Sequence, residues 1–159
     1  MKLYHFFTLF TVLMIVFSCK SDVSDSYVVK DFTSYDFPIK IKVPDSISVK
    51  KGDLGFMQDL TIKGPDNYDL QVFSTEVTQS DLPKLIEEKK SEVMANPFFS
   101  KIIEEGENGF IFEKKIDTTR INYDFRVIKL QGLKEFVFQT SLVGKFTLDE
   151  ARRMYESVQ

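Results

Sequence analysis

The sequence predicts an α+β fold, with antiparallel strands and two helices that pack on the resulting sheet. Short segments rich in β-branched and aromatic residues alternate apolar and polar positions, and turn-forming residues separate them. Two other segments, 80–95 and 147–158, repeat their apolar residues at helical spacing. Together the two periodicities indicate one domain built on a sheet.

The first part of this domain is expected to consist of strands. Residues 39–43 alternate isoleucine or valine with lysine, and a Pro-Asp-Ser turn separates them from 47–49, which predicts an opening hairpin. Residues 55–62 and 69–77 should form two further antiparallel strands, because the segment between them is dense in turn formers.

A helix is expected to begin at Ser80 or Asp81 and to end near Ala95. Pro83 falls in its first turn, where the missing N–H removes no hydrogen bond, and an Asn-Pro pair follows the predicted end. The leucine, isoleucine and valine residues of this segment fall on one face, so we expect the helix to pack on the sheet.

The second half of the domain is expected to contain four strands and a closing helix. Residues 100–105 and 110–115 flank an Asn-Gly pair, which is typical of a tight hairpin turn. Residues 123–130 and 135–143 are rich in phenylalanine and valine, so they should be central strands. A capping-box sequence that begins at Thr147 predicts the start of the last helix.

The chain begins with the features of a secretory signal peptide. Lys2 precedes an apolar run over residues 3–17, shorter than the roughly 20 apolar residues that a membrane-spanning helix needs. The only cysteine, Cys19, follows this run almost directly. The segment 16–19, Val-Phe-Ser-Cys, resembles the bacterial lipobox, in which the cysteine becomes the lipid-bearing first residue of the mature protein.

This resemblance implies an organisation for the whole chain. Residues 1–18 are the expected lipoprotein signal peptide, 19–31 the lipidated cysteine with a flexible tether, and 32–159 a single α+β domain. Several acyl chains hold a protein stably on a membrane, because each buried methylene contributes about 0.8 kcal/mol. Lys20 stands where an aspartate would signal retention at the inner membrane, so within the bacterial cell envelope the outer membrane is favoured over the inner.

The composition of the mature chain excludes several kinds of chemistry. Removal of residues 1–18 takes away the only histidine, His5, and lipidation uses the only cysteine. Neither a histidine-activated nucleophile nor a zinc site with the usual ligands can then be built, and we expect no cofactor and no metal. The net charge moves from −3 to −4, which argues against a nucleic-acid surface.

The predicted order of elements resembles the PsbP-like fold that DcrB-type bacterial lipoproteins share. The resemblance spans residues 32–159, and its local matches are residues 41–44, Ile-Lys-Val-Pro, and the closing helix over 147–158. It implies a twisted antiparallel sheet with helices packed on its faces. It also implies a protein without enzymatic activity that acts by docking or in an accessory role.

Phe98, Phe99, Tyr123 and Arg126 are the candidates for a partner or ligand surface. Aromatic and arginine side chains are the usual anchors of interfaces, and these four could line a groove for an apolar ligand or a partner peptide. Such residues are more often part of a core, so both interpretations stay open.

Two clusters of acidic residues have simpler structural explanations. Residues 66–69 offer three oxygen-bearing side chains suited to calcium, but the preceding Gly-Pro pair predicts a turn. Glu104, Glu105 and Glu107 could supply the paired carboxylates of a hydrolase, but charge at a strand end also keeps a sheet edge soluble.

The function expected from the sequence is therefore that of a non-enzymatic envelope lipoprotein. Cys19 would hold it on the membrane, and its domain would have a binding or accessory role, toward another envelope protein in particular. A carrier of a small apolar ligand or lipid is the alternative. A carboxylate-based hydrolase is less favoured.

Overall fold

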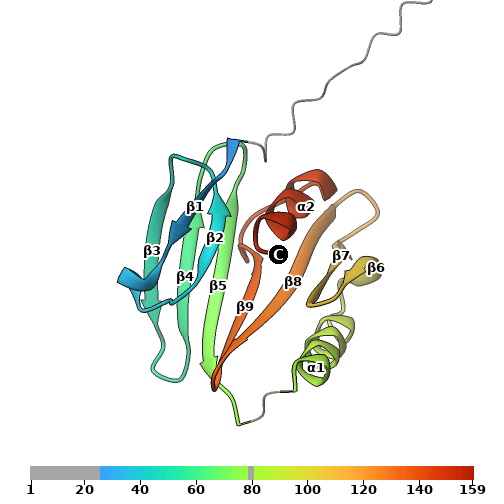
Figure 1. The fold of residues 1–159 in the computed structure, drawn as a ribbon. Helices are drawn as coiled ribbons and strands as arrows, with labels where there is room; N and C mark the ends of the chain where they lie inside the picture. The colour runs from blue at the N-terminus through green and yellow to red at the C-terminus, as the bar shows by residue number, and fades with distance from the viewer. Residues whose placement is uncertain (1–25, 79–80) are drawn as a thin grey trace, which may run out of the picture.

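A seven-stranded antiparallel sheet forms the centre of the fold (Figure 1). The computed structural model describes residues 26–78 and 81–159, so Cys19 and the expected signal peptide lie outside the described residues. In chain order the strands are β3 (Ser48–Asp53), β4 (Gln58–Lys63), β5 (Asp69–Glu76), β6 (Phe99–Gly106), β7 (Gly109–Lys115), β8 (Ile121–Gln131) and β9 (Lys134–Thr140). They lie in the order β3-β4-β5-β9-β8-β7-β6, each antiparallel to its neighbours. The predicted α+β class is confirmed.

The last four strands follow one another across the sheet, and β9, one of the two strands predicted to be central, lies in its middle position. A two-residue turn joins β6 to β7, and Gly106 pairs with Gly109 across it. The turn residues are Glu107 and Asn108, so the predicted hairpin is present but Gly109 of the Asn-Gly pair belongs to β7, and neither Asn108 nor Gly109 has a positive φ. A Cβ atom at Gly109 would lie 2.1 Å from the carbonyl oxygen of Arg126 on β8. Glycine at this position therefore permits the close approach of β7 to β8.

A second, two-stranded sheet corrects the predicted opening hairpin. β2 (Lys40–Val43) pairs antiparallel with β1 (Val28–Asp31), and β3 pairs with β4, so residues 39–43 and 47–49 do not form a hairpin. The apolar side chains of β2 are almost completely buried in the main core. Their burial holds β2 over the face of the large sheet, away from β3, and the turn between them connects two different sheets.

β1 also moves the start of the folded domain toward the N-terminus. The sequence predicts a flexible tether over residues 19–31, but Val28–Asp31 is a strand. Tyr27 already packs edge to face against Tyr68, with their ring centroids 5.5 Å apart. The expected tether is therefore too long by about five residues.

Each helix begins where its capping sequence predicts. α1 (Leu82–Met94) follows Asp81, whose side chain accepts a hydrogen bond from the amide of Lys84, and a proline lies in the first turn. α2 (Leu148–Ser157) starts with a complete capping box between Thr147 and Glu150. The side chains of Asp81 and Thr147 thus accept hydrogen bonds from amide groups that a helix N-terminus leaves without partners.

The two helices cover opposite faces of the sheet, and each face carries its own apolar cluster. The large cluster includes the fully buried Phe136 and Phe138 and lies between the sheet, the small sheet and α2. The small cluster lies under α1. Side chains alternate along a strand, and β7 shows the division: Ile111 belongs to the large cluster, whereas Phe110 and Phe112 belong to the small one.

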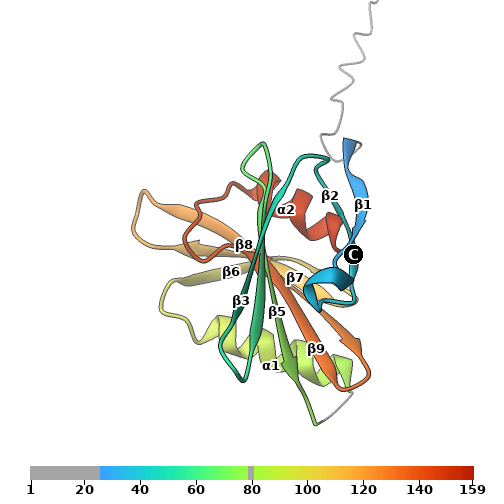
Figure 2. The same ribbon diagram turned by 90° about the vertical axis from the view of Figure 1, so that its left-hand side faces the viewer.

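The described chain begins at the end of the molecule that lies away from α1. In both Figure 1 and Figure 2 the start of β1 is at the top and α1 is at the bottom. Among residues 26–78 and 81–159, no helix is both long enough and apolar enough to cross a membrane.

Candidate functional site

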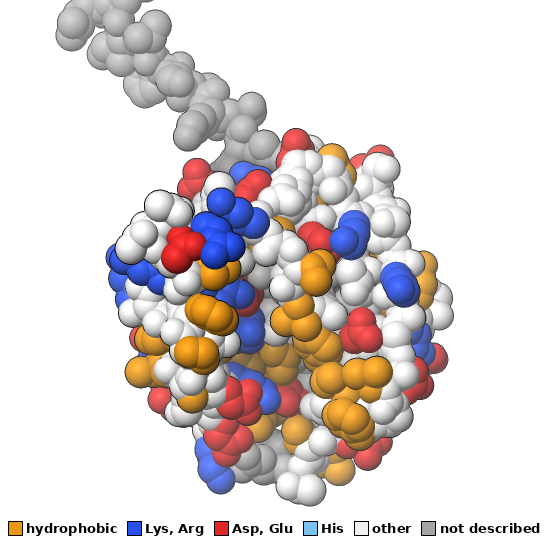
Figure 3. Space-filling model, turned by 180° about the vertical axis from the view of Figure 1, so that it is seen from behind, with side chains coloured by type: hydrophobic (Ala, Val, Ile, Leu, Met, Phe, Trp, Pro, Cys, Tyr) orange, Lys and Arg blue, Asp and Glu red, His pale blue; other side chains and the backbone are white. Residues whose placement is uncertain are grey.

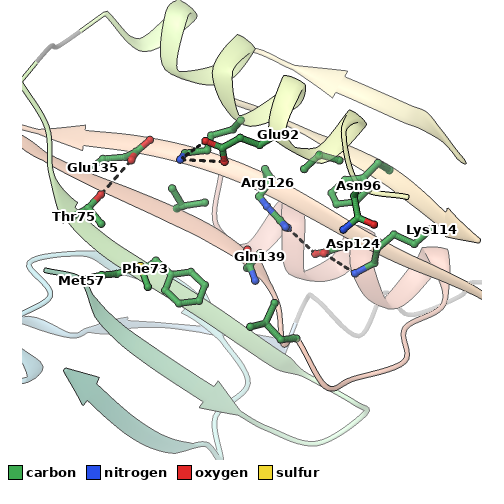
Figure 4. A pocket seen from close by; sticks show the side chains of 15 residues that line it. Met57, Phe73, Thr75, Glu92, Asn96, Lys114, Asp124, Arg126, Glu135 and Gln139 are labelled. Carbon is green, nitrogen blue, oxygen red and sulfur yellow. Dashed lines mark hydrogen bonds and ion pairs between the residues drawn. The ribbon is translucent and has the colours of Figure 1, made fainter. Parts of the chain in front are cut away.

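α1 leaves part of its face of the sheet uncovered, and a groove lies there. α1 packs mainly against β8 and β6, so the neighbouring faces of β5 and β9 stay open. The groove between them, called the α1 groove below, has a volume of about 330 Å³ (Figure 4). Figure 3 shows this face of the molecule, where charged and apolar side chains gather around a hollow.

The α1 groove is lined by two kinds of side chain. Its charged lining residues are Lys89, Glu92, Lys114, Asp124, Arg126 and Glu135. Its apolar lining residues are Met57, Phe73, Val93, Phe112, Val137 and Leu142. The lining thus combines six charged and six apolar side chains, which makes it more polar than a typical small-molecule site.

Glu135 is a buried carboxylate with one oxygen unused. Its side chain comes from the second residue of β9, beside its register partner Thr75 on β5. Glu135 is 4% exposed, and its Oε2 accepts a hydrogen bond from Thr75 Oγ1 at 3.2 Å. Oε1 has no partner, and no lysine or arginine of the described residues forms an ion pair with Glu135. A buried carboxylate in this state lacks the compensation that buried charges normally have.

Gln139 adds a second unused polar atom farther along β9. It is 5% exposed, and its amide nitrogen Nε2 has no hydrogen-bond partner. Its register partner on β5, Gln71, has an unused buried atom as well, the amide oxygen Oε1. Since over 90% of buried polar groups have partners, this concentration on one face of β5 and β9 calls for a physical explanation.

Asp124 gathers two cations at the other end of the α1 groove. It is 2% exposed, its Oδ2 lies 2.9 Å from Lys114 Nζ, and its Oδ1 lies 3.1 Å from an Arg126 nitrogen. Oδ1 also accepts hydrogen bonds from the hydroxyl and the amide of Thr140, at 2.7 and 3.1 Å. Burial by itself raises the pKa of Asp124, but Arg126, Lys114 and Thr140 outweigh it and hold the pKa below its usual value.

The arrangement leaves one positive charge in excess at this end. Arg126 and Lys114 share the single carboxylate of Asp124, and the Arg126 guanidinium also lies 5.2 Å from the ring centre of Phe112. On α1, Lys89 and Glu92 neutralise each other at 3.3 Å. The α1 groove is therefore negative at Glu135 and positive at Arg126 and Lys114.

The structure does not bring together the four residues predicted for a ligand or partner surface. Arg126 lines the α1 groove. Tyr123 points to the opposite face of β8 and donates a hydrogen bond to Glu113 at 3.3 Å. Phe99 packs in the small cluster, with its ring centroid 6.4 Å from that of Phe112, and Phe98 is 46% exposed. Cys19 lies outside the described residues.

The acidic clusters considered from the sequence have structural roles. Asp66 and Asn67 adopt left-handed backbone conformations, with φ values of 55° and 60°, as a tight turn requires. Glu104 pairs with Arg152, and Glu105 pairs with Lys90 at 2.9 Å. Within the part of the chain that the structure describes, no group of three or more acidic, histidine or cysteine residues could hold a metal ion.

The comparisons with known proteins return no relative. No family model matches the chain, and no curated protein and no solved structure matches it. The geometry of the α1 groove is therefore the basis for the functional argument.

Proposed function

We propose that this protein is a non-enzymatic envelope lipoprotein, held on a membrane through Cys19, whose domain binds a ligand in the α1 groove. The observation that carries the binding role is the pair of unpartnered atoms, Glu135 Oε1 and Gln139 Nε2. A buried polar group without a partner costs about 1–3 kcal/mol of stability. A ligand that supplies the missing partners explains why the groove keeps such groups.

The sequence around Cys19 supports the anchor, and the fold leaves the groove accessible. Residues 20–27 separate Cys19 from β1, and a fully extended chain of this length reaches at most about 28 Å. The described chain begins at the end of the molecule away from α1 (Figures 1 and 2). A domain tethered at that end holds the α1 groove away from the point of attachment. We keep the outer membrane as the favoured location.

We also propose that the domain is PsbP-like. The support is the antiparallel sheet with a helix on each face, together with a closing helix after the last strand. In that family the members mostly act by docking or in accessory roles, which agrees with a binding site and a lipid anchor in one chain.

A carrier of a small apolar ligand or lipid is the second candidate. Phe73, Val137 and Leu142 favour it, since they give the α1 groove apolar contact area. An apolar ligand would leave Glu135 Oε1 desolvated and unpaired, however, so a ligand with polar groups is the better match.

Experiments in living cells test the lipid anchor and the α1 groove together. Palmitate labelling and fractionation of the wild type are compared with Cys19→Ser, which should lose both the label and the membrane association. A photo-crosslinking amino acid is placed at Leu142, an exposed groove residue, or at the equally exposed control Val29 on β1. Crosslinked products from position 142 alone support the proposal. The same products from both positions, or unchanged fractionation of Cys19→Ser, contradict it.

A further inference from the structure

We infer that the ligand of the α1 groove is a short zwitterion of dipeptide length, with its ammonium group at Glu135 and its carboxylate at Arg126 and Lys114. This inference rests on the proposed function, because it names the class of ligand for the same groove. Three observations carry it: the charge at each end, the distance between the ends, and the unpartnered atoms along the floor.

The Glu135 end requires a cationic hydrogen-bond donor. Glu135 lines the α1 groove and is only 4% exposed (Figure 4). Thr75 occupies its Oε2, and its Oε1 is buried without a partner. An ammonium group supplies both the missing hydrogen bond and the opposite charge, and such charge-assisted bonds are about twice as strong as neutral ones. A neutral donor would satisfy the hydrogen bond alone.

The other end suits an anion. Arg126 and Lys114 hold Asp124 between them, and their side chains remain 16% and 22% exposed toward the groove. One carboxylate cannot neutralise both cations, so a ligand carboxylate placed beside them completes the charge balance. The planar guanidinium group is well suited to a carboxylate partner.

The distance between the two ends selects the length of the ligand. Gln139 follows Phe138, the register partner of Val127, and so lies beside Arg126. Glu135 is four residues earlier on β9, so its Cα atom lies about 13 Å along the strand from that of Gln139. An extended dipeptide spans about 7 Å, and a charge-assisted hydrogen bond of about 2.8 Å at each end extends this to about 13 Å. The strand spacing therefore favours a dipeptide over a single amino acid.

The middle of the groove matches the rest of such a ligand. Phe73 and Val137 on the floor and Val93 on α1 offer apolar contacts to its side chains. Gln139 also lines the groove, and its buried Nε2 has no partner in the protein, so a peptide carbonyl of the ligand would supply the missing acceptor. The volume of about 330 Å³ lies at the small end of the range for ligand sites, about 300–1,000 Å³.

Calorimetric titration of the full chain in non-ionic detergent tests this inference. The probes are leucyl-leucine, N-acetyl-leucyl-leucine, leucyl-leucine amide, leucine and myristate. Leucyl-leucine should bind at least tenfold more tightly than N-acetyl-leucyl-leucine, the amide or leucine, because each of these lacks one charge or the required length. This comparison needs no variant, so it does not depend on whether a variant folds.

Two variants assign the effect to the groove. Glu135→Gln keeps the shape of the side chain. It should reduce the preference for leucyl-leucine over N-acetyl-leucyl-leucine by at least tenfold. The matched control is Glu113→Gln, because Glu113 is also buried, at 6% exposed, but bonds to Ser100 and Tyr123 on the opposite face of the sheet. The control should leave the preference unchanged, and thermal unfolding checks that both variants are folded.

The outcomes separate this inference from the proposed function. Equal binding of free and capped peptides, or tight binding of myristate alone, overturns the zwitterion and leaves the α1 groove as a binding site. Absence of binding by every probe also overturns the zwitterion. In that case the crosslinking from positions 142 and 29 decides whether the proposed function falls with it.

Discussion

Replacing Gln139 by methionine should stabilise the protein that has no ligand bound. The side chain is 5% exposed, and its Nε2 donates to no protein atom. A buried unsatisfied donor costs about 1–3 kcal/mol, and methionine has a similar length and no polar group to desolvate. Part of the gain is offset because methionine does not reproduce the shape of the amide, so we expect the free energy of unfolding to rise by about 1 kcal/mol.

Urea unfolding measures this change. With a slope of about 2 kcal/mol per molar urea, the midpoint should rise by about 0.5 M. In thermal unfolding the same change corresponds to about 4 °C. Gln131→Met is the control, because Gln131 is exposed and its substitution should stay within about 0.5 kcal/mol of the wild type. A loss of more than about 1 kcal/mol in Gln139→Met would refute the reasoning, since the amide would then have a stabilising partner.

Three further substitutions test other parts of the account. Asp124→Asn should cost about 3–5 kcal/mol near pH 7, because it removes the partner that Lys114 and Arg126 share. The folded state holds the pKa of Asp124 below its unfolded value of about 3.9, so this stabilisation is present above that pH and is lost as the pH falls through the folded pKa. Urea midpoints of wild type and variant should therefore converge in acid, and a constant difference would contradict the assignment. Thr147→Ala should cost about 1 kcal/mol by removing the capping box of α2, and no change in the urea midpoint would count against it. Gly109→Ala should cost about 1–3 kcal/mol, because its Cβ would meet the backbone of β8, and a wild-type melting temperature would disprove that contact.

The sequence predicts the local elements of this fold well, because their signals are local. Asp81 and Thr147 mark the helix starts, and the Asn-Gly pair lies within one residue of the turn between β6 and β7. The pairing of β2 is different, since it depends on which surface buries the apolar side chains of the strand. That surface is the face of a sheet formed by residues far away in the sequence, so the turn at Pro44 gives a misleading signal.

The α1 groove is harder to predict for the same reason. Of the four residues that the sequence predicts for a ligand or partner surface, Arg126 is the one that lines the groove. Tyr123 and Phe98 are candidates because of their aromatic side chains, and they lie elsewhere. Glu135 and Gln139 belong to no motif. They alternate with Phe136 and Phe138, but polar residues on the second face of an antiparallel strand are common, so this alternation does not by itself indicate a site.

The central claim is that the α1 groove binds a short zwitterion of dipeptide length, and nuclear magnetic resonance of the full chain in detergent tests it most directly. On titration with leucyl-leucine, the backbone amide signals of Thr75, Glu135, Val137 and Gln139 should shift in a saturable way, while those of α2 on the opposite face stay in place. Signals that do not move at millimolar peptide, or that move on α2 alone, would contradict the account.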